Sequence, residues 1–174
     1  EGELQRGAVK KLSPGGTNIL PSDSVIFGEK EAASTDYPDF NIGAQNIAGI
    51  AVDEYGFFCV FDTTYSKLYF YDNECNMLCA FGGGFDSGTQ KGTFQRISGI
   101  DMKGDDILVA DSMKKSITVF RCTDYGKKLK ALRKLTADGE YKQAEQGWEE
   151  IHKADADNRF AYIGLAKAAL SDGR

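Results

Sequence analysis

The chain of 174 residues is 41% hydrophobic and 11% aromatic, which excludes a disordered polar chain and is enough apolar material for one or two packed domains. Its formal net charge of −5 at pH 7 excludes a general nucleic-acid binder, because such a protein needs a basic surface that displaces counterions from phosphates. No apolar run approaches the roughly 18–20 residues of a membrane-spanning helix, so we expect no membrane span in this segment.

Residues 1–44 form a divergent segment that is rich in Gly, Pro and Ser and has one strand candidate, at residues 18–20 or 25–27. We expect this segment to belong to a preceding repeat unit. The alternative is that it covers the open face of the first sheet described next.

Residues 45–124 contain one stretch written twice. Gly49 matches Gly99 at an offset of 50, and Asp62 matches Asp111 at an offset of 49. In each copy, short runs of apolar residues are separated by turn-forming residues, which is typical of an antiparallel meander of short strands. A period of this length indicates a stacked or radial array. The expected strands are residues 50–52, 57–61, 68–71 and 77–81, then 99–102, 107–110 and 117–121, with an uncertain fourth strand in the second copy.

The repeat resembles a known family. Residues 49–53 read Gly-Ile-Ala-Val-Asp, Asp62 follows the second strand, and the unit ends in Phe81-Gly82. This pattern resembles the NHL repeat, the four-stranded blade of six-bladed β-propellers, over about residues 45–121. The second copy departs from it at residues 102–103, Met-Lys. The resemblance implies two propeller blades, and further blades N-terminal to them, because two blades cannot close a ring.

The periodicity changes at about residue 125, where the charge balance also changes. Residues 1–124 carry 11 basic and 18 acidic side chains, whereas residues 125–174 carry 10 and 8. Apolar residues then recur at helical spacing, which predicts helices from residue 127 to 137, over residues 140–154 and over residues 160–170. We expect Asp157 or Asn158 to cap the third helix at its N-terminus.

The helical region resembles a second family. Gly139 and Gly173 follow two helix ends 34 residues apart, and Ala144 and Trp148 have the spacing of a small and an aromatic packing position. This pattern resembles the tetratricopeptide repeat over residues 127–174, about one and a half repeats that we expect to be truncated. The fold class expected is therefore mixed: antiparallel propeller blades followed by an α-helical solenoid.

In that family the first helix of each pair lines a concave groove. The resemblance places Arg133 and Lys167, 34 residues apart, at equivalent groove positions, with Lys130 beside them. These three cations are the candidate peptide-binding residues and favour an acidic protein or peptide partner. The carboxylate clamp of some family members is not reproduced, because Ile163 and Gly164 stand at its positions.

No catalytic, cofactor or metal site is expected. The single histidine, His152, has no second histidine with which to form a metal site or a triad, so we interpret it as a surface residue. Asp62 and Asp111 recur at equal positions, which favours a structural role in every repeat over catalysis. The glycines of residues 82–84 lack a following helix and a Lys-Ser/Thr pair, so an inter-blade loop is favoured over a phosphate loop.

The four cysteines have no framework spacing, and free thiols are favoured over disulfides. The function predicted is a non-enzymatic scaffold that binds a protein or peptide and needs no cofactor. One alternative is a lactonase- or lyase-like propeller enzyme with a central active site mostly in absent blades. Another is an envelope protein in which this segment precedes a membrane domain, so the bacterial cell envelope is slightly favoured over the cytoplasm.

Overall fold

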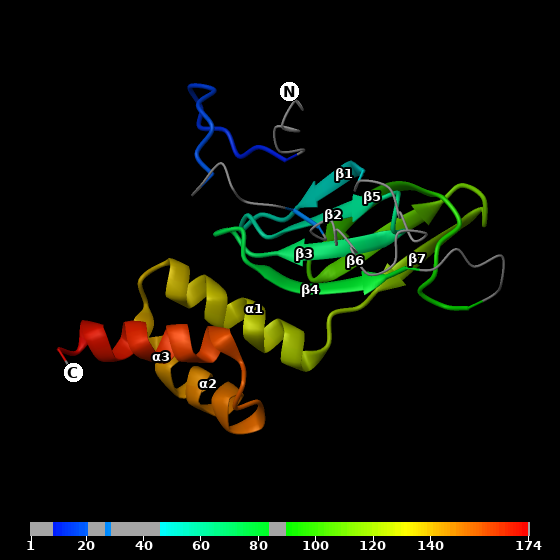
Figure 1. The fold of residues 1–174 in the computed structure, drawn as a ribbon. Coiled ribbons are helices and arrows are strands. Elements are labelled where there is room, and N and C mark those ends of the chain that lie inside the picture. Colours follow the sequence, from blue (N-terminus) through cyan, green and yellow to red (C-terminus); the bar gives the residue numbers. More distant parts are fainter. Residues whose placement is uncertain (1–8, 21–26, 29–45, 84–89, 174) are drawn as a thin grey trace, which may run out of the picture. The chain divides into compact units, whose positions relative to one another are not determined.

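The computed structural model describes residues 9–20, 27–28, 46–83 and 90–173 (Figure 1). The chain divides into two compact units, Glu1–Phe120 and Arg121–Arg174. Each unit is described by itself below. Together they form a mixed α/β protein, with two antiparallel sheets followed by three helices, which confirms the fold class at that level.

The first unit contains two antiparallel meanders. The first sheet has strands β1 (Ile47–Val52), β2 (Phe58–Asp62), β3 (Lys67–Tyr71) and β4 (Met77–Gly82), hydrogen-bonded in chain order. The second has β5 (Ile97–Lys103), β6 (Asp106–Asp111) and β7 (Ser116–Phe120), also in chain order. Each strand contains most of a predicted one, because alternating apolar positions and turn residues mark them well.

Among the described residues no fourth strand follows β7. Helix α1 (Asp124–Ala137) begins instead, three residues earlier than predicted. Thr123 is its N-cap: the Oγ1 atom accepts a hydrogen bond from the Gly126 backbone N–H at 3.1 Å. A threonine that satisfies a first-turn amide favours helix initiation, so the chain turns helical where a fourth strand would begin.

The repeat is visible in the backbone. A register shift falls between Ile47 and Gly49 in the first sheet and between Ile97 and Gly99 in the second. The loops after β2 and β6 also match, since Ser66 and Lys115 both adopt positive φ angles, of 52° and 51°. A bulge and a left-handed residue at the same repeat positions show that the two copies share one backbone design.

Asp62 and Asp111 anchor these loops. The carboxylate of Asp62 accepts backbone N–H bonds from Asn46, Thr64 and Tyr65. That of Asp111 accepts the same type of bond from Gln95, Arg96, Met113 and Lys114. Both side chains are buried, at 0% and 3% exposure. They fix the loop by accepting several amides at once, which is the structural role predicted for them.

A hydrophobic cluster joins the two sheets. Cys59, Phe61 and Leu68 come from the first sheet, Ile97, Ile107 and Val109 from the second, and Phe94 from the connection between them. Phe81 and Phe120 extend the cluster, with ring centroids 4.8 Å apart. The sheets therefore pack face to face through alternate positions of their strands.

The other face of the first sheet carries a second cluster, built on Phe58, Val60, Tyr69 and Tyr71. The described part of the N-terminal segment packs on it through Phe27, Val9 and Leu20. The Phe27 ring lies 5.3 Å from that of Tyr71, and the Gly28 N–H donates to the Tyr71 hydroxyl at 2.7 Å. Of the two strand candidates there, residues 18–20 have a single bridge, Leu12 with Asn18, and residues 25–26 lie outside the described residues.

The second unit has three helices, α1, α2 (Tyr141–Ala154) and α3 (Arg159–Ser171). Asn158 caps α3, because its side-chain oxygen accepts from the N–H groups of Phe160 and Ala161, as predicted. Gly139 and Gly173, which follow α1 and α3, have φ angles of 82° and 72°. Glycine takes this left-handed conformation without strain, so both helices end at a left-handed glycine, and the two glycines are 34 residues apart.

Candidate peptide-binding surface of the helical unit

The interior of the helical unit is organised by Trp148. This side chain on α2 is 0% exposed, and its Nε1 donates to Thr136 Oγ1 of α1 at 3.0 Å. The Thr136 hydroxyl in turn donates to the Leu132 carbonyl at 2.8 Å. An indole buried with its N–H satisfied stabilises the contact between α1 and α2 and fixes their register. Trp148 is therefore a packing residue, as its spacing predicts.

Two glycines allow the helices to approach each other. A Cβ atom at Gly164 of α3 would lie 2.3 Å from Trp148 Nε1, and one at Gly147 of α2 would lie 2.4 Å from Leu132 Cδ2. Both distances are far below van der Waals contact, so a larger residue at either position would force the facing side chain to move. The sequence did not indicate this, because a helical glycine signals close packing only once its neighbour is known.

Arg133, one of the three candidate groove cations, lies in the interior. It is 2% exposed, and its Cζ lies 5.0 Å from the centroid of the Phe160 ring. Arg159 Cζ lies 4.8 Å from the same centroid. A guanidinium stacks well on an aromatic face, so Phe160 in the first turn of α3 holds Arg133 in place. Arg133 does not present its charge to solvent.

The other two candidates differ in accessibility. Lys130 is 9% exposed, whereas Lys167 on α3 is partly exposed. Lys130 and Arg133 are one helical turn apart on α1, and Lys167 lies on α3. Lys167 is the most accessible of the three, and their part in peptide binding stays a prediction.

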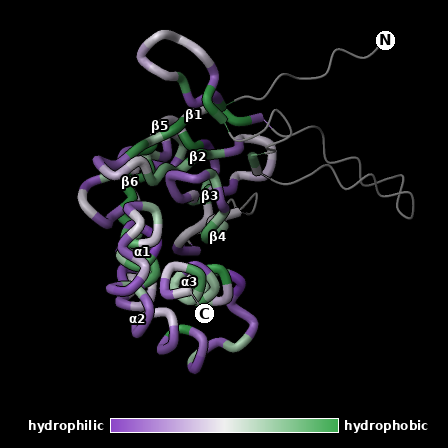
Figure 2. Tube along the Cα trace, turned by 90° about the vertical axis from the view of Figure 1, so that its left-hand side faces the viewer, coloured by the Kyte–Doolittle hydropathy of each residue, from purple (hydrophilic) through white to green (hydrophobic). Residues whose placement is uncertain are grey.

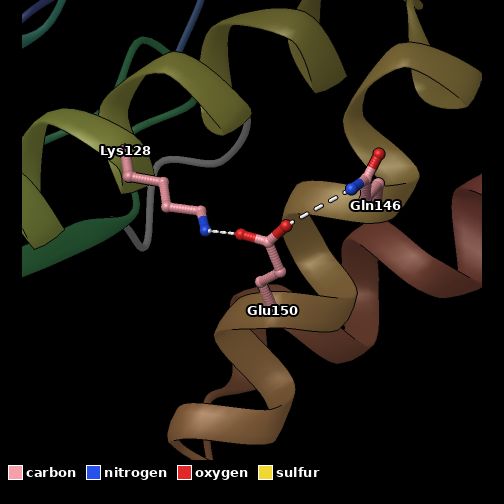
Figure 3. A network of polar contacts seen from close by, with 3 residues as sticks. All are labelled: Lys128, Gln146 and Glu150. Atoms are coloured by element: carbon pink, nitrogen blue, oxygen red, sulfur yellow. Dashed lines mark hydrogen bonds and ion pairs between the residues drawn. The ribbon is translucent and has the colours of Figure 1, made fainter.

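A polar network links α1 to α2 (Figure 3). Lys128 Nζ forms an ion pair with Glu150, and Gln146 Nε2 donates to the other oxygen of this carboxylate at 3.5 Å. The hydrogen bond and charge of Lys128 lower the pKa of Glu150 from its usual value. Because both charged side chains are well exposed, the pair contributes little to stability, but it neutralises one cation of the basic helix.

One side of α3 presents exposed apolar side chains. Tyr162 is 55%, Ile163 43% and Leu170 75% exposed. Figure 2 shows α3 mostly in the colours of apolar and neutral residues, whereas α2 carries much of the hydrophilic colour. His152 of α2 meets Tyr162 edge to face, with ring centroids 4.9 Å apart. His152 therefore acts in packing, and an apolar surface adjoins the partly exposed Lys167.

The described residues contain no group of three metal-binding side chains and no helix long and apolar enough to cross a membrane. The four cysteines form no disulfide in the structure. Burial raises the pKa of the Cys59 thiol to about 12, so it is a core residue without thiolate reactivity.

The glycine run after β4 has a structural explanation. Gly82 and Gly83 have φ angles of 80° and 111°, and a Cβ at Gly82 would lie 3.0 Å from the Phe94 ring. Residues 84–89 lie outside the described part, and the described residues that follow lead into β5. A phosphate loop needs a helix N-terminus directly after the glycines, and those residues lie outside the described part, so the inter-blade loop stays a prediction.

No protein-family model matches the chain, and no curated protein matches its sequence.

Proposed function

We propose that this chain is a non-enzymatic scaffold that binds a protein or peptide, with two NHL-like propeller blades followed by tetratricopeptide-like helices. The observation that carries the proposal is the recurrence of one backbone unit, with its bulge, anchoring aspartate and left-handed loop residue, in both sheets. Solenoid repeat proteins bind their partners on extended surfaces that several repeats build together.

The binding surface that we propose is the exposed side of α3. It combines apolar area at Tyr162, Ile163 and Leu170 with the partly exposed cation Lys167. Aromatic and aliphatic anchors beside a cation suit a peptide that carries apolar and acidic residues in alternation. Such a ligand gains apolar burial and is attracted electrostatically to the same surface.

The test is fluorescence anisotropy with a labelled peptide of alternating Leu and Glu, compared with one of alternating Leu and Lys. We expect the acidic peptide to bind more tightly and to lose affinity as salt is added, because exposed charge attraction is screened. Lys167→Glu should weaken binding of the acidic peptide about tenfold, or about 1.4 kcal/mol.

Lys142→Glu is the matched control, since it makes the same charge change at an exposed position on α2. Equal effects of the two substitutions, or equal affinity for both peptides, would refute the proposed surface.

A further inference from the structure

Strand β7 has a free edge. It pairs with β6 on one side, and among the described residues no other strand pairs with it and no backbone hydrogen bond from outside the sheet reaches it. In an antiparallel pair, alternate residues turn both the N–H and the C=O away from the partner strand. The free side of β7 therefore presents backbone donors and acceptors to which an extended chain can bind as an added strand.

The equivalent strand of the first sheet has a neighbour on this side. Ile117 and Val119 of β7 lie 49 positions after Leu68 and Phe70 of β3 and hold the same places in the register. All five residues of β3 pair with the antiparallel strand β4, in which Phe81 lies opposite Leu68. A strand with this backbone design therefore accommodates an antiparallel neighbour on the side that is free in β7.

The side chains of β7 indicate which residues an added strand needs. Ile117 is 67% exposed and Val119 is 49% exposed, and both lie on one face because alternate strand residues share a face. Directly opposite residues on neighbouring antiparallel strands have Cβ atoms about 5 Å apart, so apolar residues opposite these two would cover them from the side. A suitable strand has apolar residues at two alternate positions.

The charge around β7 restricts the added strand further. Residues 112–121 read Ser-Met-Lys-Lys-Ser-Ile-Thr-Val-Phe-Arg and include three cations, Lys114, Lys115 and Arg121, and no acidic residue. Lys114 Nζ donates to the carbonyl and the hydroxyl of Thr93, whereas Lys115, directly before β7, is exposed. The C-terminal end of an antiparallel strand would lie near Lys115. An acidic residue there would form a favourable cross-strand charge pair.

We propose that the free edge of β7 binds an extended peptide of a partner protein as an antiparallel strand. This peptide has apolar residues at two alternate positions, followed by acidic residues at its C-terminal end. Backbone hydrogen bonds contribute affinity, and the apolar and acidic side chains contribute specificity. The edge belongs to the sheet unit, whereas the surface proposed above belongs to α3, so neither proposal depends on the other.

A second copy of the chain is a poorer occupant of this edge. Its own β7 would bring three further cations and no acidic residue to a strand that is already basic at its ends. Like charges opposite each other on neighbouring strands are destabilising. Charge complementarity therefore favours an acidic peptide over self-association through β7.

The test measures the fluorescence anisotropy of a labelled peptide in which Thr and Val alternate before two C-terminal Glu residues. Two further peptides carry N-methyl groups on alternate backbone nitrogens, one on the odd residues and the other on the even residues. An added strand donates hydrogen bonds from one edge only. We expect one methylated peptide to bind like the parent and the other to lose affinity at least about tenfold. Equal binding of the two methylated peptides would overturn the proposal.

Substitutions locate the peptide on the chain. Lys115→Glu should weaken binding of the acidic peptide about fivefold and favour a peptide that ends in two Lys residues instead. Lys103→Glu is the matched control, because it makes the same charge change at an exposed position of β5, the other edge strand of this sheet. The control should stay within about twofold. Equal effects of the two substitutions, or a loss caused by Lys167→Glu instead, would overturn the proposal.

Hydrogen exchange shows whether the edge is free in the chain itself. We expect the β7 amides that point away from β6 to exchange quickly in the free protein and to become protected when the acidic peptide is added, as measured by NMR. If these amides are already protected without peptide, the edge is covered by another segment of the chain or by a second copy, and the proposal fails. Light scattering then distinguishes these two occupants.

Discussion

The two sheets share a backbone design but differ in what their side chains contact. Gly49 and Gly99 occupy the same position beside a bulge, yet a Cβ at Gly49 would lie 2.3 Å from the Phe61 ring, whereas one at Gly99 would meet nothing within 4 Å. The residue opposite Gly99 is Ala110 instead of a phenylalanine. The comparison teaches that turns and bulges recur because each unit needs them, while packing residues follow the neighbour that each face meets.

The largest expected effect is that of replacing Asp111 or Asp62, the aspartates that hold the equivalent loops of the two sheets. Asp111→Ala removes an acceptor of four backbone N–H groups in a buried loop, and should lower the free energy of unfolding by about 3 kcal/mol, as loss of charge-assisted bonds does. Urea denaturation followed by circular dichroism measures this. Asp62→Ala, with three such donors, should be comparably harmful; if either change is neutral, the loops are held in another way.

A smaller effect should separate the two glycines. Gly49→Ala forces the Phe61 ring to move and should cost about 2 kcal/mol, in the range of overpacked cores. Gly99→Ala enters open space in a strand, so its change should stay within about 0.5 kcal/mol. Thermal unfolding of the two variants side by side measures the difference, and similar losses would show that Gly99 is also closely covered.

The smallest effect is a pH dependence from Asp111. Burial tends to raise the pKa of this carboxyl, but backbone hydrogen bonds from Lys114, Gln95, Arg96 and Met113 outweigh it and lower the pKa below its ordinary value of 3.8. The folded state thus binds the proton less readily than the unfolded state. The stability that Asp111 contributes is fully present above pH 3.8, the ordinary pKa of this carboxyl. It is lost as the pH falls through the lower pKa of the folded state.

Asp111→Asn removes this titration. The stability difference between the original chain and this variant should therefore be constant near neutral pH and shrink below about pH 4. Denaturation midpoints measured from neutral to acidic pH give the result. A difference that grows on acidification would show that the carboxyl pKa is raised instead.

Much of the fold could be predicted from the sequence, because its signals are local. Strand alternation, turn residues, the Asp62 and Asp111 recurrence and the Asn158 cap all act within a few residues. The start of α1 was misplaced because the cap at Thr123 lies before the apolar stripe begins. Local patterns place elements well and their ends less well.

The candidate site was harder to predict, because its geometry depends on distant contacts. The resemblance to the tetratricopeptide repeat places Arg133 in a groove, yet Phe160 holds it in the interior. The need for glycine at position 164 follows from Trp148 on another helix. A residue's position on a helix can be read from spacing, but its exposure depends on which neighbour packs there.

The hydrogen bond from Gly28 to Tyr71 has a consequence for folding. It joins residues 43 positions apart, whereas the meander of β1–β4 forms from neighbours in the chain. Closing so long a loop costs more conformational entropy than adding the next strand does. The described N-terminal residues that pack on the first sheet, among them Phe27, should therefore be the last part of this unit to dock during refolding. In native-state hydrogen exchange, the Gly28 amide should become accessible before those of β2 and β3.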